Sequence, residues 1–125
     1  METVKALKQK GEADYDIKHD ILFFKTKDRE YTRSIEVENL ALDIDIQGYV
    51  TGIQIFEASK FLNTPKEVLI NLAKWKLHTI VYNKRLEVRL FFQVKIRNKI
   101  VEKNPIIVES LKEPLPDSEL FCAIT

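Results

Sequence analysis

Alternation of apolar and polar residues between residues 36 and 56 predicts two antiparallel strands. One face of the first strand comprises Leu40, Leu42, Ile44 and Ile46. The other comprises Ala41, Asp43 and Asp45. After a turn at Gln47-Gly48 the alternation resumes, and Gly52 interrupts its strict period, which predicts a β-bulge. This stretch therefore predicts a hairpin with one buried face.

A longer alternating stretch runs from Arg85 to Arg97. Its apolar face consists of Leu86, Val88, Leu90, Phe92, Val94 and Ile96. Asn83-Lys84 predicts a tight turn from a preceding strand at residues 77–82, and Asn98-Lys99 predicts the next turn. Because Pro105 has no amide hydrogen, we expect the following strand, residues 106–108, to lie at an edge or to be broken there. These residues predict a second antiparallel meander.

Two segments predict helices. Residues 1–11 contain helix formers and end at Gly11, which predicts a short helix. Thr64 and Glu67 have the spacing of a capping box, and Pro65 suits the first helical position. The apolar stripe that follows at helical spacing comprises Val68, Leu69, Leu72 and Trp75. We therefore predict an α+β fold of antiparallel β-meanders, with one central helix (about 65–74) packed on the sheet.

The chain length of 125 residues, 45% of them hydrophobic, suits one domain covering residues 1–125. Every apolar run is short and interrupted by charges, so we predict a cytoplasmic protein with no membrane partner. Cys122 is the single cysteine, which excludes an internal disulfide, and we expect an inert thiol. The core must therefore form without covalent cross-links.

Charge is distributed unevenly along the chain. Residues 11–62 contain six Lys or Arg and eleven Asp or Glu, a balance of −5, whereas residues 74–103 contain nine and two, a balance of +7. Such asymmetry suits either attraction between the two halves, within one chain or across a dimer, or binding to an acidic partner. We favour the first interpretation.

The polar face of the strand at residues 85–97 is the main candidate binding surface. Its candidate residues are Arg85, Arg89, Phe91, Lys95 and Arg97. Basic residues around an aromatic ring are typical of surfaces that bind single-stranded nucleic acid. The alternative, which we favour, is that Phe91 belongs to a dimer seam or a second buried layer.

Carboxylates form a second candidate site. Asp43 and Asp45 share one strand face, where they could bind a cation or act as an acid and base, but we expect a solvated face. The sequence has no GxGxxG, GxxxxGK[ST], HExxH, CxxC or GxSxG motif, and three glycines are too few for a phosphate-binding loop. We therefore expect no catalytic residues, metal site or cofactor.

Residues 13–62 resemble a family of small prokaryotic proteins, domain of unknown function 2283. The matching positions are Tyr15, Asp16, Asp20, Leu22, Glu36, Val37, Asp43, Gly48, Gly52, Ile53, Ile55, Ala58 and Ser59. The resemblance implies a β-meander closed by a helical turn, with no established activity. Some members resemble antitoxin partners of small toxin-like proteins, which implies protein binding by analogy. Residues 63–125, with the helix and the basic strands, depart from the family pattern.

Three functional hypotheses follow. The first is a non-enzymatic protein-interaction module, self-associating or antitoxin-like, because long strands leave edges that need a partner. The second is a nucleic-acid-binding protein that uses the basic face of residues 85–97. The third is a small hydrolase-like enzyme that uses the clustered carboxylates.

Overall fold

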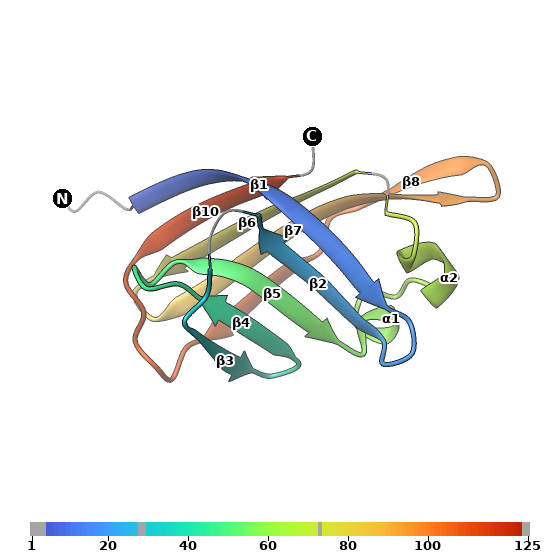
Figure 1. Cartoon of the computed structure of the whole chain (residues 1–125). Coiled ribbons are helices and arrows are strands. Elements are labelled where there is room, and N and C mark those ends of the chain that lie inside the picture. The colour runs from blue at the N-terminus through green and yellow to red at the C-terminus, as the bar shows by residue number, and fades with distance from the viewer. Residues whose placement is uncertain (1–4, 28–29, 73, 124–125) are drawn as a thin grey trace.

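The computed structural model describes residues 5–27, 30–72 and 74–123. Among the residues that the structure describes, strands account for 61% and helices for 7%, so the fold is mostly β, and the prediction of an α+β fold is wrong. In the described residues, the strands form a single sheet that curls into a half-barrel (Figure 1). The described elements, in chain order, are β1 (Lys5–Asp16), β2 (Ile21–Thr26), β3 (Arg33–Val37), β4 (Leu40–Ile44), β5 (Val50–Phe56), α1 (Ala58–Phe61), α2 (Lys66–Leu69), β6 (Lys74–Tyr82), β7 (Arg85–Ile96), β8 (Lys99–Lys103), β9 (Ile106–Ser110) and β10 (Ser118–Ala123).

Strand order divides the sheet into two halves that share β1. The order is β3-β4-β5-β2-β1-β10-β6-β7-β8, and β9 also pairs with β7. Residues 11–16 of β1 pair with β2, which completes the N-terminal half-sheet of β2 to β5. Residues 5–10 of β1 pair with β10, which completes the C-terminal half-sheet of β6 to β10. Of the described strand pairs, only β1 with β10 is parallel.

Gly11 lies where β1 passes from one half-sheet to the other. A Cβ atom at this position would overlap the Trp75 ring and the Cys122 sulfur. The crossing therefore requires a residue without a side chain. The predicted helix at residues 1–11 is wrong for the described residues, because β1 begins at Lys5 and Gly11 continues the strand.

The core fills the space between the two half-sheets. The largest fully buried side chains are Trp75, Phe24, Phe92, Leu22, Leu40, Leu42, Ile44, Ile53, Ile55, Leu69, Leu77 and Leu86. Phe24 on β2 and Trp75 on β6 meet edge to face, with ring centroids 4.9 Å apart, so side chains of both half-sheets interlock directly. One continuous cluster of buried residues results.

The predicted central helix is reduced to α2, a single turn over Lys66–Leu69. Trp75 belongs to β6, where Trp75, Leu77, Thr79 and Val81 alternate as buried residues. Pairing with β7 and β10 provides hydrogen-bond partners for the backbone of this segment on both sides. These hydrogen bonds favour a strand more strongly than the spacing of the preceding apolar residues favours a helix. The predicted capping box is also wrong, because the Thr64 hydroxyl donates to the Leu62 carbonyl at 3.0 Å.

Several local predictions are confirmed. Asn83 and Lys84 adopt positive φ angles of 49° and 63° in the tight turn before β7. The register of β4 against β5 shifts next to Gly52, as the predicted bulge requires. Ile46 is an exception: β4 ends at Ile44, so Ile46 lies in the turn and is 87% exposed.

Candidate interaction surface

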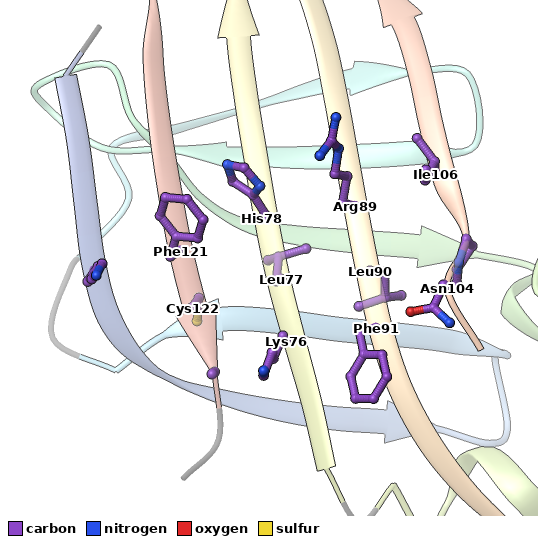
Figure 2. Close-up of a pocket in the computed structure, with 13 residues that line it drawn as sticks. Lys76, Leu77, His78, Arg89, Leu90, Phe91, Asn104, Ile106, Phe121 and Cys122 are labelled. Carbon is purple, nitrogen blue, oxygen red and sulfur yellow. The ribbon is translucent and has the colours of Figure 1, made fainter. Parts of the chain in front are cut away.

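The outer face of the C-terminal half-sheet, which points away from the core, carries an apolar groove of about 470 Å³. Side chains from β10, β6, β7 and β9 line it, and Lys8 joins them from β1 (Figure 2). Strict alternation along β6 and β7 produces this face, because every second residue points into the core.

Strand register arranges the outer face in rows that cross the strands. The His78 row crosses five strands and consists of Lys8, Phe121, His78, Arg89 and Ile106. Residues paired directly across neighbouring strands are in contact distance on one face, so the row is continuous. It forms one side of the groove, and Lys76 and Phe91 lie on the other side.

Three more rows flank the first. The Ile80 row, two residues along each strand, consists of Glu119, Ile80, Glu87 and Val108. Beyond it, Tyr82 pairs with Arg85, and on the far side of the His78 row Lys76 pairs with Phe91. The face therefore combines aromatic, aliphatic, basic and acidic side chains.

Two of the aromatic side chains in the groove make close contacts with neighbouring side chains. The His78 ring stacks on Phe121, with centroids 3.9 Å apart and planes inclined by 18°. The Lys76 ammonium lies 5.9 Å from the centre of the Phe91 ring, within the range of cation–π attraction. The Nε2 atom of His78 is buried without a hydrogen-bond partner among the described residues, and it lies 3.7 Å from the Glu119 carboxylate.

The five predicted binding residues are spread over the outer face and one turn. Arg89 and Phe91 line the groove, and Arg85 lines a separate hollow beside Tyr82. Lys95 lies further along β7, roughly 33 Å from Arg85 at about 3.3 Å per residue. Arg97 is not on the strand, because it occupies the turn before β8 with a φ angle of 48°. The predicted turn at Asn98-Lys99 is thus displaced by one residue.

Other groove residues were missed by the sequence reasoning. Phe121, Ile106 and Lys8 come from three strands that only the sheet order brings beside β6 and β7. Along β10, Leu120 and Cys122 point into the core and are buried, so Phe121 between them points to the outer face. That alternation is the one signal in the sequence that pointed to an exposed Phe121.

The acidic candidates Asp43 and Asp45 are buried, so the expected solvated face is wrong. An oxygen of Asp45 accepts the amide hydrogens of Gln47 and Tyr49, both at 2.9 Å, which fixes the turn between β4 and β5. Asp43 accepts a hydrogen bond from the Ser34 hydroxyl at 2.8 Å. These bonds give both carboxylates a structural role.

Asp20 joins β1, β2 and α1. Its carboxylate accepts hydrogen bonds from the Tyr15 hydroxyl at 2.7 Å, the Ser59 amide at 3.0 Å and the Ser59 hydroxyl at 2.6 Å. Burial raises the pKa of Asp20, but the bonds from Ser59 and Tyr15 outweigh it and keep the pKa below the ordinary value. Burial, together with the bond to Asp20, raises the pKa of the Tyr15 hydroxyl. Tyr15, Asp20 and Ser59, three positions of the family resemblance, are therefore joined by hydrogen bonds in the fold.

Cys122 lies under the groove and is 2% exposed. Burial raises the pKa of its thiol to about 11. Among the residues that the structure describes, no three His, Cys, Asp or Glu side chains gather as metal ligands would. No helix within those residues has the length and apolar character to cross a membrane.

Comparison with known proteins assigns one segment of the chain to a family. Residues 13–59 match the family described as "Protein of unknown function (DUF2283)". A Methanosarcina mazei protein named "Putative hypoxanthine phosphoribosyltransferase" is 31% identical over 90 residues, which span 72% of this chain and 73% of that protein. An uncharacterised protein of Methanocaldococcus jannaschii is 32% identical over 68 residues, 54% of this chain and 59% of that protein. No solved structure matches the chain significantly. Through residues 13–59, the chain belongs to the DUF2283 family.

Proposed function

We propose that this chain is a non-enzymatic protein-interaction module that self-associates through the outer face of the C-terminal half-sheet. The observation that carries the proposal is the groove, in which partly exposed Phe121 and exposed Ile106 lie beside Phe91 outside the core. Contiguous apolar surface of this kind favours burial against another protein, because water is released from it.

Charge supports a second copy of the chain as the partner. The face contains bases at Lys8, Lys76 and Arg89, and acids at Glu87 and Glu119. Because this surface has both acidic and basic side chains, the acids of one copy can pair with the bases of a second copy. A uniformly anionic partner would meet repulsion from both glutamates.

The size of the face favours a weak dimer. Five strands about 4.8 Å apart, over about seven residues of β7, give a flat area of roughly 500 Å². Specific interfaces bury about 800 Å² on each partner, so this face is at the lower end. We therefore expect a dimer that forms in the micromolar range and dissociates on dilution.

The test is sedimentation equilibrium over a concentration series with a matched pair of variants. Phe121→Ser removes a groove ring that is 37% exposed, whereas Phe61→Ser removes an equally exposed ring, at 41%, on α1. The proposal predicts that Phe121→Ser weakens the dimer at least tenfold and that Phe61→Ser leaves it unchanged, with circular dichroism confirming that both fold. Equal effects of the two variants would reject the groove as the contact surface.

Nucleic-acid binding is the second candidate, favoured by the Lys76 ammonium over the Phe91 ring and by Arg89 beside it. It predicts retention of the protein on single-stranded nucleic acid at low salt, with release as salt rises. The double variant Arg89→Ala, Lys95→Ala would abolish that retention. Absence of binding at low salt would eliminate this candidate.

We do not propose an enzyme. The Methanosarcina relative is named for a phosphoribosyl transfer, and glycine-rich loops are a common way to bind phosphate groups. Each glycine of this chain is packed instead: Gly11 against Trp75, Gly48 against Pro116, and Gly52 against the Phe24 carbonyl and Asp43. The hydrolase alternative loses its support as well, because hydrogen bonds hold Asp43 and Asp45 in structural roles.

A further inference from the structure

We infer that two copies of this chain pack face to face about a two-fold axis that crosses the strands between the His78 row and the Ile80 row. The inference rests on the proposed function, because it specifies how the second copy binds to the same face. It states which row of the second copy lies on each row of the first, and thereby identifies the residues that determine how the two copies associate.

The geometry follows from the rotation. The axis lies midway between the two stacked sheets and runs perpendicular to their strands. Rotation about it lays each strand on the same strand of the other copy, in the antiparallel direction. Rows at equal distances from the axis then exchange, so the His78 row of one copy lies on the Ile80 row of the other. Stacked sheets lie about 10 Å apart, a distance that side chains from both faces fill.

Two of the four opposed pairs from β10, β6, β7 and β9 in these rows are complementary. Arg89 meets the partner subunit's Glu87, and Ile106 meets the partner subunit's Val108. His78 meets the partner subunit's Ile80, and Phe121 meets the partner subunit's Glu119. One charged pair and one apolar pair therefore form twice, once on each side of the axis.

The flanking rows agree with the same axis. Phe91 comes opposite the partner subunit's Arg85, and Lys76 comes opposite the partner subunit's Tyr82. Arg85 and Tyr82 are exposed in the single chain. Both pairs place a cation against an aromatic ring, which is favourable and becomes stronger as water leaves.

Other axes fit less well. An axis along the His78 row would set Arg89 against the partner subunit's Arg89. An axis parallel to the strands, between β6 and β7, would set Arg89 on the partner subunit's His78 and Glu87 on the partner subunit's Ile80. In the second arrangement neither charge meets an opposite charge on the other copy, and burying charges without such a contact costs free energy.

Charge reversal tests the arrangement. Arg89→Glu and Glu87→Arg each create two like-charged contacts in a homodimer, so each variant should dimerise at least tenfold more weakly than the natural chain. In an equimolar mixture of the two variants, both contacts between position 89 of one copy and position 87 of the other again join an acid to a base. A heterodimer should therefore form with the natural affinity. Lys18→Glu, a reversal in the exposed turn after β1, is the matched control and should leave dimerisation unchanged.

The mixture excludes an effect within one chain. Arg89 also lies 3.3 Å from Glu87 of its own strand, and both single variants break that contact. Mixing cannot restore a contact within either chain, so rescue by mixing requires contact between copies. Failure of rescue, in a protein whose dimer depends on Phe121, would overturn this arrangement and leave the proposed function intact. A natural chain that never dimerises would reject both.

Discussion

Gly11 packs against Trp75 where β1 leaves the C-terminal half-sheet for the N-terminal one. The indole ring occupies the volume that a side chain at residue 11 would fill, and the ring in turn meets Phe24 from the other half-sheet. The contact therefore links the path of the backbone to the packing of the core.

Replacing Gly11 with alanine should destabilise the protein, because the added methyl group must displace the Trp75 ring or the Cys122 sulfur. Overpacking of this kind costs about 1–3 kcal/mol of unfolding free energy. Urea unfolding followed by tryptophan fluorescence measures the loss. Lys10→Ala, at the exposed neighbouring position, is the control, and an equal loss there would contradict the packing argument.

Asp20→Asn should lower stability at neutral pH, because the carboxylate accepts three hydrogen bonds from Tyr15 and Ser59. Asparagine keeps one of the two oxygen acceptors, so about one hydrogen bond to a charged group is lost, and a loss of about 1.5–3 kcal/mol of unfolding free energy is expected. Urea unfolding at neutral pH measures the difference between this variant and the natural chain.

Acid should remove the same stabilisation. Since the folded state lowers the pKa of Asp20, its contribution is present above the ordinary value of 3.8 and is lost as pH falls through the lower folded value. Urea midpoints measured from neutral to acid pH should therefore decline less steeply for Asp20→Asn than for the natural chain. Asp16→Asn, which alters the exposed pair with His19, should change the midpoints little. Parallel pH profiles for the natural chain and Asp20→Asn would refute this role.

Cys122 should resist thiol reagents while the protein is folded. With a pKa of about 11, about one thiol in a thousand is ionised at pH 8, and burial blocks access as well. A chromogenic aromatic disulfide should react at least a hundredfold faster after unfolding in guanidinium chloride. Equal rates in native and unfolded protein would show that the thiol is accessible from the groove.

Local periodicity predicted the hairpins well, and non-local pairing explains the failures. Asn83 and Lys84 were located correctly because a two-residue turn is encoded by its own residues and the alternating strands beside it. Trp75 was misassigned because its environment comes from β7, β10 and Phe24, none of which is adjacent in sequence. Residues 5–10 were misassigned for the same reason, since their partner β10 lies more than a hundred residues away.

The candidate surface was predicted only in part. Alternation along β7 correctly separated Arg89 and Phe91 from the buried face. The sequence could not show that Phe121 and Ile106 lie in the same cross-strand row as Arg89, because register depends on the assembled sheet. The location of the protein in the cytoplasm and its organisation as one domain stay predictions.

The central claim is that the outer face of the C-terminal half-sheet joins two copies of the chain. Static light scattering on the natural protein, from about 1 µM to about 1 mM, tests it most directly. We predict a molar mass that rises from that of one 14.6 kDa chain toward twice that value. A mass that stays at one chain up to the highest concentration would contradict the claim.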